Sequence, residues 1–242
     1  LHIIRDFGMD GATYKAVEFK GETFSNMSMD ARMTVCNMVV EMGGKNGVME
    51  ADTITQQYLE ERGVKSVNPV TSDPDAQYVE TREYDASALD PQVACPHSVD
   101  NVKSVREVEG IEVDQAFIGT CTNGRLEDLE IAAKILKGRR VSARVRLIVV
   151  PATYEVYRQA LERGLLKIFV DAGALVESPG CGACMGCHIG VVGPGEVSIS
   201  ASNRNFKGRQ GSPESEVYLA SPATVAASAV EGKITDPREM YG

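Results

Sequence analysis

The stretch ESPGCGACMGCHIG at residues 177–190, together with the strand end FIGTCTNG at residues 117–124, decides how this chain is organised. Each stretch follows an apolar run with the composition of a strand. A single cysteine between two glycines and a Cys-x-x-Cys pair sixty residues later are each weak signals. Together they predict a metal site built by three thiolates, those of Cys121, Cys181 and Cys184.

Around these stretches, the second half of the chain alternates strand-like and helix-like segments. Strands are expected at 115–119, 145–150, 174–177, 196–202 and 216–221. Helices are expected at 125–138, 153–164 and 222–232. Asn123 is the candidate cap of the first of these helices. Such alternation predicts an α/β fold with a mostly parallel sheet flanked by helices.

The first half carries two helix signals. Ser28 or Asp30 can cap a helix that runs through residues 29–44 and ends at a pair of glycines. A second helix is expected at 52–62. Cys36 falls on the apolar side of the first helix, so its simplest role is in the core.

Further along, residues 78–85 alternate between polar and apolar side chains like a strand, and residues 91–105 look irregular. A boundary is expected near the end of the irregular segment. We therefore predict two α/β domains, covering residues 1–104 and 105–242, with the predicted thiolates in the second.

The composition narrows the class of protein. A chain of 242 residues with 43% hydrophobic and 24% charged residues has the balance of a soluble globular protein. The net charge of −9 argues against nucleic acid or an anionic membrane as a partner. Clustered cysteines without a secretion signal indicate reduced thiols in the cytoplasm. The absence of an initiator methionine suggests a fragment whose front part is missing.

Three informative loops follow expected strands: TCTNG, SPGCGACMG and SNRNFKGR. Ligands of open α/β sheets bind beyond the carboxyl ends of the strands, so one shared site is expected there. The third loop places Arg204, Lys207 and Arg209 close together in an acidic chain. An arginine presents a planar fork suited to a carboxylate, whereas the plainer interpretation is a solvated basic loop.

Three kinds of metal site are compatible with the cysteines. The string from Cys184 to His188 matches the haem-attachment pattern Cys-x-x-Cys-His, but covalent haem needs an oxidising compartment. Zinc bound by Cys181, Cys184, Cys187 and His188 would leave Cys121 unexplained. An iron–sulfur cubane held by three thiolates leaves one iron open, which is what a Lewis-acid catalyst needs.

Four motifs in this order resemble the aconitase superfamily nearly from end to end: CNMVVEMG, GTCTNGRLED, CGAC and SNRNFKGR. The subgroup that the chain resembles most comprises the large subunits of archaeal-type 3-isopropylmalate dehydratases (isopropylmalate isomerases), with homoaconitase as a close relative. The resemblance implies two aconitase-like three-layer domains. On their own, Asn37 and Glu41 suggest a solvated polar stripe of a helix. The resemblance implies instead that both belong to the expected site.

The resemblance implies a cofactor and its ligands. Cys121, Cys181 and Cys184 would hold a [4Fe–4S] cluster whose fourth iron is open. Asn37, as a catalytic residue, and Asn203, as a substrate-binding residue, would hydrogen-bond around the cluster and its ligands. Because the family's N-terminal domain is absent from this sequence, we expect the cysteine loops to be mobile and the cluster to be lost in air.

The resemblance to the aconitase superfamily also implies a reaction. Glu41 would act beside the hydroxide or water on the open iron, and Arg204 and Arg209 would bind substrate carboxylates, whereas Lys207 matches a variable position. The reaction would convert 2-isopropylmalate to 3-isopropylmalate by dehydration and rehydration, in leucine biosynthesis. The substrate class is a 2-hydroxy di- or tricarboxylate, with homoaconitase or a related hydratase as the alternative.

Three features depart from the family pattern. The active-site histidines and aspartate of the N-terminal domain are missing, and the serine base belongs to a separate small subunit. This chain alone is therefore expected to be inactive and to form a heteromer with that small subunit. Cys187 is not a usual family ligand. Two alternatives of another class are a zinc-stabilised, non-catalytic assembly domain and RNA binding, which the acidic balance opposes.

Overall fold

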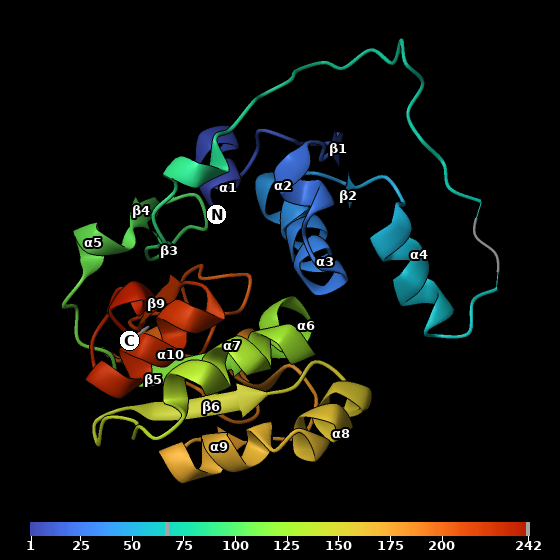
Figure 1. Ribbon diagram of the computed structural model, residues 1–242. Helices are drawn as coiled ribbons and strands as arrows, with labels where there is room; N and C mark the ends of the chain where they lie inside the picture. Colours follow the sequence, from blue (N-terminus) through green and yellow to red (C-terminus); the bar gives the residue numbers. More distant parts are fainter. Residues whose placement is uncertain (66–67, 241–242) are drawn as a thin grey trace.

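The computed structural model describes residues 1–65 and 68–240 (Figure 1). Its strands form a seven-stranded sheet of order β4-β3-β9-β8-β5-β6-β7 and a two-stranded parallel sheet of β1 and β2. Their bounds are β1 Ala16–Glu18, β2 Asn46–Val48, β3 Gln92–Ala94, β4 Val102–Ser104, β5 Gln115–Gly119, β6 Arg146–Val150, β7 Leu175–Val176, β8 Val197–Ser200 and β9 Glu216–Leu219. Strands β5 to β9 run parallel, whereas β3 pairs antiparallel with both β4 and β9.

One face of the large sheet packs on the helices of the second half. These helices are α7 Leu126–Leu136, α8 Tyr154–Glu162, α9 Leu165–Ala172 and α10 Pro222–Glu231. Alternate strand residues, such as Ala116, Ile118, Leu147 and Val149, share one core cluster with buried side chains of α7, α9 and α10. This period of two is what a strand imposes on its side chains. The predicted mostly parallel sheet flanked by helices is confirmed.

The intervening residues of the same strands face the other way and meet two different partners. Val217 and Leu219 of β9 pack against residues of the first half, including Val39 and Met42. Phe117 of β5, with Ile148 and Val150 of β6, packs against the buried Ala183 and Cys184 of the cysteine loop. The sheet therefore supports the first half of the chain and the cysteine loop on one face.

Most of the regular structure in the first half is helical. Its helices are α1 His2–Phe7, α2 Glu22–Ser25, α3 Met29–Met38, the 3-10 turn η1 Val39–Met42, and α4 Thr53–Glu60. The Ser28 side chain accepts a hydrogen bond from the Ala31 amide, and Asp52 caps α4 in the same way. Both predicted helices of this half are confirmed, with Ser28 as the cap of the first.

Two predictions for the connecting region are wrong. Residues 78–85 form no strand, although all of them are described. Instead they run as an extended segment (Figure 1). The side chains of Arg82 and Tyr84 in this segment donate hydrogen bonds to Asp6. Residues 92–104, expected to be irregular, form the hairpin of β3 and β4 and join the large sheet next to β9. The sheet thus crosses position 104, and the two-domain division stays a prediction.

The remaining elements are short. The chain also contains α5 Val105–Val108, α6 Thr120–Asn123 and the 3-10 turns η2 Ala86–Ala88, η3 Gly182–Met185 and η4 Pro237–Met240. Asn123 does not cap α7 as expected. Its side chain donates to the Ala201 carbonyl, while Arg125 and Asp128 form the cap. No helix within the described ranges is both long and apolar enough to cross a membrane.

Candidate active site

The strand order places the three informative loops at one edge of the sheet. From β5 the chain proceeds to β6 and β7 on one side, whereas β8 and β9 lie on its other side. The order therefore reverses between β5 and β8, and in open α/β sheets this is where ligands bind. The loops after β5, β7 and β8 supply the three motifs, as the sequence predicts.

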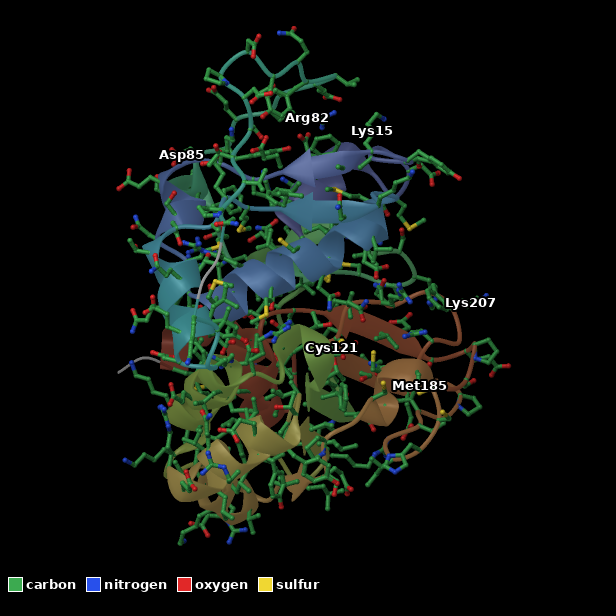
Figure 2. The ribbon with its side chains drawn as sticks, turned by 90° about the vertical axis from the view of Figure 1, so that its right-hand side faces the viewer. Lys15, Arg82, Asp85, Cys121, Met185 and Lys207 are labelled. Atoms are coloured by element: carbon green, nitrogen blue, oxygen red, sulfur yellow. The ribbon has the colours of Figure 1, made fainter. Side chains whose placement is uncertain are left out.

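Cys121 lies directly beyond β5, in a turn with little freedom. A Cβ on Gly119 would come within 2.2 Å of the Val150 carbonyl oxygen, so only glycine fits there. Thr120 follows with a φ of 70°, which is unusual for a β-branched residue. The Asn37 amide donates to the Cys121 sulfur at 3.7 Å. Figure 2 shows Cys121 between the helices of the first half and the sheet.

The Cys-x-x-Cys pair lies around the 3-10 turn η3. The Cys184 amide donates to the Cys181 carbonyl at 3.0 Å, and residues three apart lie on the same side of such a turn. Cys184 is 6% exposed, whereas Cys181 is exposed. Gly186 ends the turn with a φ of 72°, so the exposed Cys187 leaves in another direction.

The loop after β8 reaches the same place from the other side. Cys184 donates through its thiol to the Asn203 carbonyl oxygen at 3.7 Å. The Arg209 guanidinium donates to the Cys184 sulfur at 3.8 Å. Lys207 is exposed and, in Figure 2, lies near Met185 on the same side of the molecule.

Glu41 joins the first half of the chain to this loop. One of its carboxylate oxygens accepts from the Asn203 amide at 2.8 Å and from Arg204 Nε at 2.8 Å. The Glu41 side chain is 9% exposed, and the Arg204 side chain is 35% exposed. A nearly buried carboxylate needs such donors to offset its lost hydration.

The structure therefore brings seven of the eight predicted site residues into two contact sets. One contains Asn37 and Cys121, and the other contains Cys184, Asn203, Arg209, Glu41 and Arg204. Cys181 joins the second set through the backbone of its turn.

Two residues near Cys121 were not predicted. Arg125 donates to the Cys121 carbonyl at 3.0 Å, and Thr34 donates to the Thr122 carbonyl at 2.6 Å. Thr34 precedes Asn37 by three residues on α3, so helix periodicity around the recognised motif could have found it.

Two further cysteines, Cys36 and Cys95, are poorly suited to metal. Burial raises the pKa of both the Cys36 and the Cys95 thiols, which disfavours the thiolate that binds metal. Cys36 is only half-buried rather than a full core residue.

The chemistry of the site residues fits thiolate ligands of a metal cluster. Across the described ranges, no group of three or more His, Cys, Asp or Glu side chains is arranged to hold one metal ion. The zinc site of Cys181, Cys184, Cys187 and His188 stays an alternative prediction. The thiolates of a cubane each bind a separate iron, so they need not converge on a point. Nitrogen–hydrogen groups directed at two of the sulfurs are the surroundings that such thiolates require.

Comparison with known proteins identifies the family of the chain. The family model "Aconitase family (aconitate hydratase)" matches residues 1–109 and 101–232. The chain belongs to the aconitase family.

Individual relatives are more specific. The chain is 60% identical over 240 residues to the "Probable 3-isopropylmalate dehydratase large subunit" of Methanothermobacter thermautotrophicus, covering 99% of this chain and 57% of that protein. It is 56% identical to the "3-isopropylmalate dehydratase large subunit 2" of Archaeoglobus fulgidus, over 99% of this chain and 58% of that protein. It is 54% identical to the "Probable methanogen homoaconitase large subunit" of M. thermautotrophicus, over 100% of this chain and 56% of that protein. The chain thus spans less than two thirds of the length of these relatives.

Proposed function

We propose that this chain is the cluster-binding part of the large subunit of a cytoplasmic hydro-lyase. It would interconvert 2-isopropylmalate and 3-isopropylmalate in the biosynthesis of leucine, a branched-chain amino acid. The observation that carries the proposal is the convergence of Asn37 on Cys121 and of Asn203 and Arg209 on Cys184. The names of the relatives supply the substrate.

Cys121, Cys181 and Cys184 would hold a [4Fe–4S] cluster. When bound by three protein thiolates, such a cluster supplies an open iron that polarises hydroxyl and carboxylate oxygens of the substrate. The Asn37 amide and the Arg209 guanidinium would donate hydrogen bonds to the thiolates, which stabilises their negative charge.

Arg204 and Arg209 would bind the substrate carboxylates. Glu41 engages Arg204 through Nε, which fixes the plane of the guanidinium. The two terminal nitrogens have no partner within the described part of the chain, so they can present the edge that grips a carboxylate with two hydrogen bonds. Arg209 has a buried Nε without a partner within the same ranges, which a substrate oxygen could satisfy.

Glu41 and Asn37 would act on the reacting groups. Dehydration removes the substrate hydroxyl together with a proton from the neighbouring carbon, and rehydration returns them to exchanged positions. Glu41 would accept a hydrogen bond from that hydroxyl while it leaves. The carbon-bound proton would go to a serine of the small subunit, so the isolated chain is expected to be inactive.

Homoaconitase is the second candidate. Two of the relatives, 54% and 55% identical, carry that name, so the identities alone separate the two reactions only narrowly. The two substrates share the 2-hydroxy acid that Arg204 and Arg209 would hold, and they differ in the side group. Comparing 2-isopropylmalate with homocitrate in the assay below decides between them.

The test uses the full-length large subunit combined with its small subunit. Cys121→Ser removes one thiolate and should reduce hydration of isopropylmaleate to background. Cys187→Ser is the matched control in the neighbouring loop and should keep activity within about twofold, because no role is assigned to this thiol. Full activity of Cys121→Ser would contradict the proposal.

A further inference from the structure

A row of buried serines lies under the loop after β8. Ser198 and Ser200 are fully buried, and Ser202 is 4% exposed. They occupy alternate positions, so their side chains point away from the core face that holds Ile199 and Ala201. Buried hydroxyls need hydrogen-bond partners, and a neighbouring side chain must supply them here.

Gln210 supplies hydrogen-bond partners for these three serines. This side chain is fully buried, and it accepts from the Ser198 hydroxyl at 2.8 Å. Its amide nitrogen donates to the Ser200 hydroxyl at 3.0 Å and to the Ser202 hydroxyl at 3.5 Å. One side chain thus ties the returning arm of the loop to the strand from which the loop departs.

The backbone around Gln210 also connects to the cysteine loop. The Val192 amide donates to the Gln210 carbonyl at 2.9 Å, and the Ser212 amide donates to the Val192 carbonyl at 2.9 Å. A Cβ on Gly186 would come within 2.8 Å of the Arg209 carbonyl oxygen, so the two loops are in close contact there. Arg209 therefore lies between two constraints. The Gln210 side chain anchors the chain to the serines of β8, and the Arg209 carbonyl contacts Gly186 of the cysteine loop.

We propose that Gln210 is a positioning residue, which holds Arg209 so that its guanidinium lies against the Cys184 sulfur. The proposal rests on the proposed function, because Arg209 and Cys184 are its substrate-binding and cluster-binding residues. Gln210 acts through its neighbour and does not itself touch substrate. Without its side chain the three serines lose a common partner, and the arm carrying Arg209 becomes free to move off Cys184.

The experiment measures how well the thiol of Cys184 is covered in the metal-free, reduced chain. Alkylation by iodoacetamide is followed by mass spectrometry, one cysteine at a time. Gln210→Met keeps the length of the side chain and removes its hydrogen bonds. We expect the alkylation rate of Cys184 to rise about tenfold relative to that of Cys36, which matches the loss of one or two buried hydrogen bonds.

The matched control is Ser228→Ala in α10. It removes a buried hydroxyl that donates to the Thr224 carbonyl at 2.7 Å and accepts from the Thr235 amide at 3.1 Å. It should lower stability without changing the ratio of the Cys184 and Cys36 rates. Should Gln210→Met fail to fold, Ser198→Ala removes one partner and should raise the ratio about threefold.

An unchanged Cys184 rate in the folded variant, or an equal rise in Ser228→Ala, would overturn the proposal. The assay needs neither iron nor activity, so its outcome does not depend on the proposed reaction. Conversely, the Cys121→Ser test leaves Gln210 in place, and its failure would leave the positioning result standing.

Discussion

At the residue scale, Glu41 connects the first half of the chain to Asn203 and Arg204 in the loop after β8. A single oxygen receives both the Asn203 amide and Arg204 Nε. Neither the position of Glu41 on its helix nor its neighbours in sequence indicate this partner. Asn37 and Glu41 could be placed in the site from their motif, but their partners 84 and 162 residues away could not be assigned without the fold.

Asp128 carries a pH-dependent contribution to stability. Burial, together with the nearby charges of Asp30 and Glu127, raises the pKa of its carboxyl group to about 7, although the Arg125 amide partly opposes this. The folded state therefore keeps a proton that the unfolded state loses near pH 4. Stability should fall as the pH rises from about 4 to about 7 and stay level above that.

Replacing this carboxyl group tests that assignment. Asp128→Asn keeps an oxygen that can accept from the Arg125 amide, and it cannot ionise. The variant should be more stable than the wild type at pH 8, by about 1–3 kcal/mol, with a flatter pH profile of urea denaturation. Asp171→Asn, which changes an exposed carboxylate on α9, is the control. An unaltered pH profile in Asp128→Asn would refute the raised pKa.

At the scale of elements, a partly buried ion pair connects α3 to α4. Arg32, which is 4% exposed, donates to both oxygens of Asp52, at 2.8 and 2.6 Å. It also donates to the Met27 and Ser25 carbonyls, so the guanidinium stabilises the loop before α3. The Arg32 guanidinium holds the pKa of Asp52 well below its usual range.

Removing this arginine should loosen the junction of the two helices. Arg32→Met leaves Asp52 without its cation and should lower the free energy of unfolding by about 2–4 kcal/mol at pH 7. Because the folded pKa of Asp52 is lowered, the difference should shrink as the pH falls below about 4, where the carboxylate of the unfolded chain takes up a proton that the folded wild type does not. Arg158→Met, in an exposed ion pair on α8, should change stability by less than about 1 kcal/mol. Equal effects of the two replacements would contradict this account.

Helices and strands could be predicted from the sequence where their signals lie within their own residues. The helices α3, α4, α7 and α10 carry caps and apolar periodicity in their own residues, and β5, β6, β8 and β9 are short apolar runs. The hairpin of β3 and β4 was missed because its place is decided by pairing with β9, near the other end of the chain. The alternation at 78–85 wrongly predicted a strand. Polar side chains of this segment bind Glu18 and Asp6, whereas in a strand they would face solvent on one side of a sheet.

At the scale of the whole molecule, the sheet brings the motifs together. The cysteine loop packs on Phe117, Ile148 and Val150, while the first half packs beside it on β9. Asn37 and Glu41 thereby reach loops that follow β5 and β8. The sequence predicted that the three loops share one sheet edge, since their strands were recognisable. It could not predict that one face of that sheet carries both the cysteine loop and the first half.

The same arrangement explains why Cys187 differs from its neighbours. Cys181 and Cys184 lie around one 3-10 turn, whereas Gly186 redirects the chain before Cys187. Spacing alone leaves Cys187 available as a zinc ligand with His188. The contacts of Asn37 with Cys121 and of Arg209 with Cys184 support the three cysteines of the aconitase motifs as the proposed ligands.

The most direct measurement is the content of iron, zinc and acid-labile sulfide per chain after anaerobic reconstitution of the full-length subunit. The account predicts about four irons with matching sulfide in the wild type and in Cys187→Ser. Cys184→Ser should lose the cluster. Stoichiometric zinc without sulfide, or equal iron in all three proteins, would contradict the account.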